Sequence, residues 1–125
     1  MIEGALETSR LSASDIGHIH AHGLGTIRCD IEEAKAINAT LGDTPVVAAK
    51  SLMGNLGGGS GMVEMIGSLL AVNDGQLFPT TNCDSLDSAC PINLVTKPGT
   101  SAGDTFINLN ITPQGQASSI VIRKA

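Results

Sequence analysis

The chain has 125 residues, 42% of them hydrophobic and only 2% aromatic, so we expect one domain over residues 1–125 with an aliphatic core. The net charge of −5 argues against a surface for nucleic acid or an acidic membrane, because such a surface needs clustered Lys and Arg. No apolar run is long enough to cross a bilayer, and the first residues do not form a signal peptide.

The first residues in chain order predict a helix, a turn and a strand. Apolar residues recur at helical spacing within 2–10, and residues 11–15 have the composition of a turn. Residues 16–21 predict a short strand that ends in a glycine-containing loop. The chain therefore begins with a helix followed by a strand.

A second helix and a second strand follow. Asp30 and Glu33 have the spacing of a capping box, so we expect the helix to begin at Asp30. Its apolar positions recur on one face, and Gly42 ends it. Residues 46–49 are all apolar, which is typical of a strand in the middle of a sheet.

The glycine-rich segment 50–64 leads into an apolar helix that ends at 73–75. Small residues at Ser60, Gly67 and Ala71 lie on nearly one face of this helix, which favours a central, buried position. The segment admits three interpretations: a phosphate cradle, an acyl-transfer site or a structural bend. Its Lys-Ser precedes the glycines, and no glycine triplet has dinucleotide-fold spacing, so we do not expect nucleotide binding.

The last third of the chain predicts paired strands. Residues 77–82 are extended and 83–102 are irregular. Residues 105–112 and 118–124 alternate in polarity, and the turn residues 113–116 predict a hairpin between them. The order of elements predicts an α/β domain in which helices cover one mixed sheet.

Histidine and cysteine residues raise the question of a metal site. Histidine occupies every second position from 18 to 22, so the three side chains share one face of the predicted strand. Simple strand alternation explains this pattern better than metal binding, because no carboxylate or cysteine follows at ligand spacing. Cys29, Cys83 and Cys90 lack Cys-x-x-Cys spacing, so we expect reduced thiols in a cytoplasmic protein, without a disulfide or metal site.

Several motifs together resemble a known family. They are Ala-His-Gly-x-x-Thr-x-x-x-Asp-x-x-Glu at 21–33, Lys-Ser-x-x-Gly at 50–54, Val-Glu at 63–64 and Pro-Thr-x-Asn at 79–82. In this order and spacing they resemble the C-terminal half of β-ketoacyl-ACP synthases, over nearly the whole chain. The resemblance implies a thiolase-like half-domain, a layered mixed sheet with helices packed on it.

The resemblance also implies site residues. In this family a cysteine takes the acyl chain from acyl carrier protein, and two histidines assist the decarboxylation of malonyl-ACP. His22 matches the first histidine, Lys50 the family lysine, and Glu64 the carboxylate that pairs with it. Thr26 matches a threonine that contacts the phosphopantetheine arm. We expect Lys50 to act through its charge and bonds rather than as an acid or base.

The chain also departs from the family pattern. Asn55 stands where the second histidine is expected, and asparagine can donate a hydrogen bond but cannot accept a proton. A relative in the same superfamily pairs histidine with asparagine, so catalysis remains open. Leu24 replaces the first of two pantetheine threonines. Residues 111–116 replace a glycine-rich closing loop, and Pro113 is expected to stiffen it.

The nucleophile is the remaining question. Asp87-Ser-Ala-Cys90 resembles the family's nucleophile motif letter by letter, but Cys90 lies after His22 and is followed by Pro91. The family cysteine lies far upstream, so we do not expect Cys90 to be the nucleophile. Neither of the other two cysteines lies at the family position.

These observations leave two functions. The first is the C-terminal domain of a condensing enzyme. We expect it to have no cofactor of its own and to need acyl carrier protein and an N-terminal ketosynthase half or subunit. We also expect a dimer. Residues 1–4 would fall inside a family helix, which favours a piece of a longer enzyme over a divergent free-standing protein. The alternative is a non-catalytic module that binds a ketosynthase or carrier protein.

Overall fold

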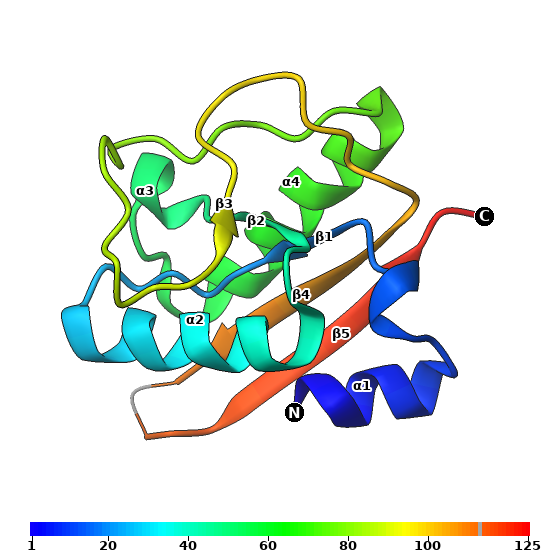
Figure 1. Cartoon of the computed structure of the whole chain (residues 1–125), viewed down its shortest axis with the longest axis horizontal. Coiled ribbons are helices and arrows are strands. Elements are labelled where there is room, and N and C mark those ends of the chain that lie inside the picture. Colours follow the sequence, from blue (N-terminus) through cyan, green and yellow to red (C-terminus); the bar gives the residue numbers. More distant parts are fainter. Residues whose placement is uncertain (113) are drawn as a thin grey trace.

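A five-stranded mixed sheet forms the centre of the computed structural model, which describes residues 1–112 and 114–125. The strands lie in the order β3-β2-β1-β4-β5 (Figure 1). β1 (His18–His20), β2 (Pro45–Val47), β3 (Asn93–Leu94) and β4 (Thr105–Ile111) are parallel to one another, whereas β5 (Ala117–Arg123) runs antiparallel to β4. The predicted mixed sheet and layered α/β class are confirmed.

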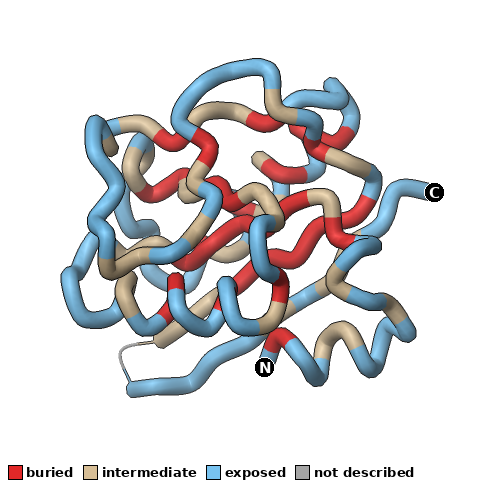
Figure 2. The backbone as a smooth tube through the Cα atoms, in the orientation of Figure 1, coloured by how far each residue is buried: buried red, intermediate tan, exposed pale blue. Residues whose placement is uncertain are grey.

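Helices cover both faces of this sheet. α1 (Ile2–Ser9) and α2 (Ile27–Leu41) lie on one face, and α4 (Ser60–Asp74) lies on the other (Figure 1). Alternation along the strands supplies one aliphatic cluster to each side, with Ile19 and Ile107 facing α2 and Val47 and Phe106 facing α4. The buried residues accordingly follow the central strands (Figure 2).

The start of α2 differs from the prediction. The helix begins at Ile27, with Thr26 as its N-cap residue, so the predicted capping box of Asp30 and Glu33 is wrong. Both carboxylates instead accept backbone N–H groups from the loop that precedes the helix. Because the helix starts three residues before Asp30, neither carboxylate stands at the position of a cap, and both are free to bind the loop amides. The predicted end at Gly42 is confirmed, with φ of +56°.

The glycine segment forms two short helical turns before α4. α3 (Lys50–Met53) follows β2 directly and ends at Gly54, and residues Gly57–Gly59 form a 3-10 turn. The small-residue face of α4 packs as expected, because Gly67 lies close to the rings of Phe78 and His20. The other face of α4 is exposed, so within this chain the helix is buried on one side only.

The last third of the chain contains one element that the sequence did not predict. β3 is only two residues long and pairs with the edge of β2 through Leu94 and Val46. The predicted hairpin is confirmed in β4 and β5, which pair over seven residues each. Pro113, predicted to stiffen the connecting turn, lies outside the described residues.

Candidate active site

Two loops at the carboxyl ends of β1 and β2 bring the predicted polar residues together. His22 follows β1, and Lys50 begins α3 just after β2. Because β1 and β2 are parallel neighbours, their carboxyl ends lie at the same edge of the sheet. Glu64 reaches the same point from the second turn of α4.

Lys50 joins the other residues through its ammonium group. Nζ donates to the His22 carbonyl oxygen at 2.6 Å and forms a buried ion pair with Glu64 Oε1. It also lies 3.2 Å from Nδ1 of His22. A lysine ammonium has three donors and no acceptor, so these three contacts occupy all its protons. Lys50 therefore holds the His22 ring, the His22 backbone and Glu64 in place through its single ammonium group.

This geometry assigns the protonation of His22. Nδ1 must accept from Lys50, because the ammonium cannot accept, so the neutral ring carries its proton on Nε2. Burial and the Lys50 charge lower the pKa of His22, against smaller opposing effects of Asp30 and Asn110. His22 is therefore a neutral hydrogen-bond donor at neutral pH.

Glu33 fixes the backbone of the His22 loop. Its two carboxylate oxygens accept the N–H groups of His22 at 2.7 Å and Gly23 at 2.9 Å. Burial raises the pKa of Glu33, and these two amide bonds partly offset that effect. The sequence placed Glu33 in a family motif but indicated a helix cap, because spacing alone does not distinguish loop amides from helix amides.

The other two histidines of the strand have structural partners. His20 accepts the N–H of Ala49 at Nε2, so its Nδ1 donates to the Ser68 hydroxyl at 2.9 Å. His18 bonds the Ala102 carbonyl at 2.7 Å and stacks on Phe106. Among the described residues no group of three or more His, Cys, Asp or Glu side chains could hold a metal ion.

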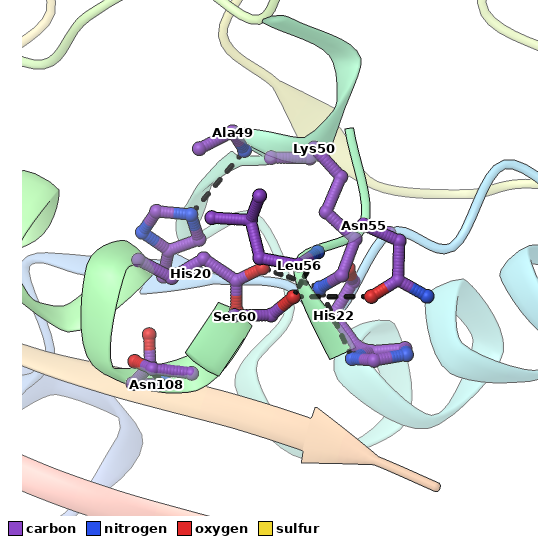
Figure 3. Close-up of polar contacts among 12 residues, drawn as sticks. His20, His22, Ala49, Lys50, Asn55, Leu56, Ser60 and Asn108 are labelled. Carbon is purple, nitrogen blue, oxygen red and sulfur yellow. Dashed lines mark hydrogen bonds and ion pairs between the residues drawn. The ribbon is translucent and has the colours of Figure 1, made fainter. Parts of the chain in front are cut away.

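Asn55 lines the same cavity as Lys50 and is bonded to the start of α4 (Figure 3). Its Oδ1 accepts from the Ser60 hydroxyl at 3.1 Å and the Gly57 N–H at 3.0 Å. Ser60 in turn accepts the N–H of Leu56 at 2.8 Å. These bonds fix the orientation of the Asn55 amide and leave its Nδ2 as a donor directed elsewhere.

A cavity of about 500 Å³ lies beside this cluster, between α2 and the loop at residues 80–92. Thr26, Lys50 and Asn55 line it, whereas His22 does not. Thr26, the N-cap residue of α2, is exposed. Ala21 and Gly23 do line the cavity, so it extends along the loop that carries His22.

Comparison with known proteins identifies the family. The sequence model for "Beta-ketoacyl synthase, C-terminal domain" matches residues 1–84. The chain belongs to the β-ketoacyl synthase C-terminal domain family. The family that the motifs predicted is thus confirmed.

Relatives of this β-ketoacyl synthase domain come from fatty acid and polyketide synthesis. The chain is 42% identical over 96 residues to 3-oxoacyl-[acyl-carrier-protein] synthase 2 of Mycobacterium leprae, covering 75% of this chain and 23% of the relative. It is 38% identical over 98 residues to actinorhodin polyketide putative beta-ketoacyl synthase 1 of Streptomyces coelicolor, covering 75% of this chain and 21% of that protein. The chain thus spans about a quarter of these relatives.

Solved structures confirm the fold of the ketosynthase domain. The ishigamide ketosynthase/chain length factor matches with a TM-score of 0.93 and 28% identity, over 99% of this chain and 32% of the other. A type II polyketide ketosynthase solved with its acyl-carrier protein matches with a TM-score of 0.91 and 27% identity, over 99% of this chain and 32% of the other. These matches confirm the predicted thiolase-like fold over 99% of this chain.

Cys90 of this ketosynthase domain lies in an environment that opposes a thiolate. It is half-buried at the wall of the cavity, and burial and the nearby Asp87 carboxylate raise its pKa. A nucleophilic cysteine needs the opposite shift. The raised pKa is consistent with the sequence-based expectation that Cys90 is not the nucleophile.

Proposed function

We propose that this chain forms the histidine half of a decarboxylative condensing site that acts on malonyl and acyl groups carried by acyl carrier protein. The observation that carries the proposal is the contact of Lys50 with Nδ1 of His22, which leaves Nε2–H as the donor. The ion pair of Lys50 with Glu64 holds this arrangement in a buried site.

The proposed reaction needs a donor and no change in the charge of His22. The bond from the malonyl α-carbon to its carboxylate breaks, CO₂ leaves, and the electron pair moves to the thioester carbonyl oxygen as an enolate. A fixed donor such as Nε2–H lowers the barrier when it is directed at this developing charge. Nδ2 of Asn55 supplies a second donor. The enolate carbon then attacks an acyl thioester, forming the new C–C bond and releasing a thiolate.

The thiol that carries the acyl group comes, in this proposal, from an N-terminal ketosynthase half or subunit. Support comes from the outer face of α4, which we define as Met62, Val63, Ile66, Leu69 and Leu70. All five side chains are exposed, and contiguous apolar surface of this kind marks an interaction site. The matched ketosynthases are about three to four times longer than this chain, which leaves ample sequence to cover this face.

Acyl carrier protein is the proposed substrate carrier, with its phosphopantetheine arm in contact with Thr26. One matched structure is a ketosynthase in complex with its acyl-carrier protein. In this chain, the exposed Thr26 and the walls of the cavity provide hydroxyl and amide groups next to Lys50 and Asn55. An arm of alternating amide and methylene groups suits such a mixed surface.

The proposal is tested by malonyl-ACP decarboxylation with the chain and the ketosynthase subunit that purifies with it. Replacing His22 by Ala removes the donor and is expected to lower the rate about 100-fold or more. Asn55→Asp, which exchanges an amide donor for an acceptor, is expected to lower it as well. Unchanged rates in both variants would refute the proposed role.

A non-catalytic partner subunit is the second candidate function. The burial of His22 and the bonding of Asn55 Oδ1 to Ser60 and Gly57 favour it, since both side chains already have structural partners. One matched structure is itself named as a ketosynthase/chain length factor. Under this alternative, His22→Ala leaves condensation by the partner ketosynthase unchanged, while disruption of the α4 outer face abolishes binding.

A further inference from the structure

The Pro-Thr-x-Asn motif at 79–82, which we call the clasp, has no part in the proposed function, yet its side chains hold α3 at two points. The hydroxyl oxygen of Thr80 accepts the N–H of Ala48 at 3.1 Å, just before α3 begins. At the other end of the clasp, Nδ2 of Asn82 donates to the Ser51 carbonyl at 2.7 Å. The clasp therefore binds the chain on both sides of the first residue of α3.

α3 needs such support because it is very short. It has four residues, and a helix of that length is not stable by itself in water. A helix also leaves its last carbonyl groups without partners of its own, and the Asn82 amide supplies a donor to one of them, that of Ser51. The position of Lys50, the first residue of α3, thus depends on bonds from the clasp.

The clasp is itself fixed to the sheet. The Thr80 N–H donates to the Val95 carbonyl at 2.7 Å, and the Val95 N–H donates to the carbonyl of Val46 in β2 at 2.8 Å. Asn82 has a φ of +56°, a left-handed conformation that asparagine adopts more readily than most residues. Asn82 thus meets two requirements, a backbone that turns and an amide that reaches α3.

Lys50 transmits the position of α3 to His22. Its Nζ lies 2.6 Å from the His22 carbonyl oxygen and 3.2 Å from Nδ1 of the ring, so a displacement of α3 changes both contacts. We propose that Thr80 and Asn82 are positioning residues that hold Lys50 against His22 through α3. The inference rests on the proposed function only for its catalytic consequence, which is the orientation of the Nε2–H donor.

The test measures the pKa and the ring ¹⁵N shifts of His22 by NMR, in the protein as purified with any subunit that accompanies it. Asn82→Gly retains the left-handed backbone and removes the amide, whereas Thr80→Val removes the hydroxyl at nearly constant shape. Burial and the Lys50 charge lower the pKa of His22 in the unaltered protein, so this pKa should rise when Lys50 moves away. We expect a rise of about 0.5 or more in both variants, since a charge at contact distance shifts a pKa by about 1–3 units.

Two controls separate positioning from a general loss of stability. Asn93→Ala removes a bond of the same kind, from an asparagine Nδ2 to the Asp43 carbonyl at 2.9 Å, beside the start of β2. Thr80→Ser retains the hydroxyl that Thr80→Val removes. Both controls should leave the pKa and the ¹⁵N shifts of His22 unchanged, and His18, which bonds the Ala102 carbonyl, is the internal reference.

Unchanged His22 signals in folded Asn82→Gly would overturn the proposal. This variant carries the test if Thr80→Val does not fold, because Asn82 is exposed whereas Thr80 is buried. Equal changes in Asn93→Ala and Asn82→Gly would overturn the proposal too, because the loss of any such bond would then explain them.

Neither result depends on condensing activity. The expected shifts in a protein that shows no turnover would contradict the proposed function and support the role of the clasp. Turnover together with unchanged His22 signals in Asn82→Gly would do the opposite.

Discussion

At the residue scale, Lys50 is the side chain on which the candidate site depends most. It bonds His22 twice and pairs with Glu64, and both charged side chains are almost fully buried. Burial raises the pKa of Glu64, an effect that the bond and charge of Lys50 oppose. Each charge of the pair is therefore tolerated in the interior because of the other.

Replacing Lys50 by Met should leave Glu64 buried without its partner. Loss of one member of a buried pair costs about 3–5 kcal/mol, and urea unfolding at pH 8 measures it. The matched control is Lys35→Met, since Lys35 pairs with Glu32 on the surface of α2 and should lose little. Equal free energies of unfolding for the two variants would contradict the role of Lys50 in stabilising the buried site.

The buried His20 should make the free energy of unfolding depend on pH. Burial, with smaller contributions from His18 and Lys50, lowers the pKa of His20 to about 3, against an ordinary value of 6.5. Below pH 6.5 the unfolded chain therefore binds a proton that the folded chain does not. Stability should fall as pH falls from 6.5 toward 3, by about 1.4 kcal/mol per pH unit for this group.

Unfolding at a series of pH values between 8 and 4 measures this slope. His20→Asn, which retains an acceptor for the Ala49 N–H, should reduce the slope by about one proton. Glu33 and Glu64 oppose the trend, because their raised pKa values favour the folded state at low pH. An unchanged slope in the His20 variant would show that His20 does not titrate on unfolding.

At the scale of elements, β1 can follow its path only because Gly17 lacks a side chain. A Cβ atom there would lie 2.6 Å from the Ala102 oxygen and 2.7 Å from the Cα of Gly103, which itself has φ of +64°. Gly17→Ala should therefore cost about 2 kcal/mol or more. Gly4→Ala in α1, where no atom lies within 4 Å, should instead stabilise the helix slightly. Similar thermal midpoints for the two variants would contradict this reading of the contact.

The comparison of sequence and structure also belongs to the scale of elements. Strong periodic patterns located α2, α4 and the β4–β5 hairpin, because each buries one regular face against the sheet. β3 has only two residues and depends on the edge of β2, so no local pattern could reveal it. The start of α2 was missed because the loop amides, rather than the helix, bind the carboxylate of Glu33.

The site was predictable to the extent that it rests on motifs. His22, Lys50 and Glu64 were each expected from the family resemblance, and the structure places them in direct contact. The motifs gave no sign of Asn108, whose side chain donates to the Gly61 carbonyl at 3.3 Å and so joins two elements far apart in sequence. The sequence did contain a signal, because the polar Asn108 lies between the buried Ile107 and Leu109 in a central strand.

At the scale of the whole molecule, the sheet has helices on both faces, but α4 still lacks cover on its outer face. Ile66 and Leu70 are 47% and 61% exposed there. No helix in the described part of the chain is long and apolar enough to span a membrane. In the proposed function, this apolar surface binds the N-terminal ketosynthase half or subunit.

Charges on this face should abolish the partnership without unfolding the chain. The double variant Ile66→Asp, Leu70→Asp is expected to lose association with the ketosynthase subunit in size-exclusion chromatography and to unfold at an unchanged urea concentration. Thr8→Asp, on α1 at the opposite face of the sheet, is the control and should associate normally. Retained association of the double variant would place the partner elsewhere.

The most direct test of the central claim is condensation of acyl-ACP with malonyl-ACP, measured for the chain alone and for the chain with the ketosynthase subunit recovered from its source cell. We predict turnover only in the presence of a cysteine-bearing partner, and loss of that turnover when His22 is replaced by Ala. Turnover by the purified chain alone, or full activity of the complex with His22→Ala, would contradict the account.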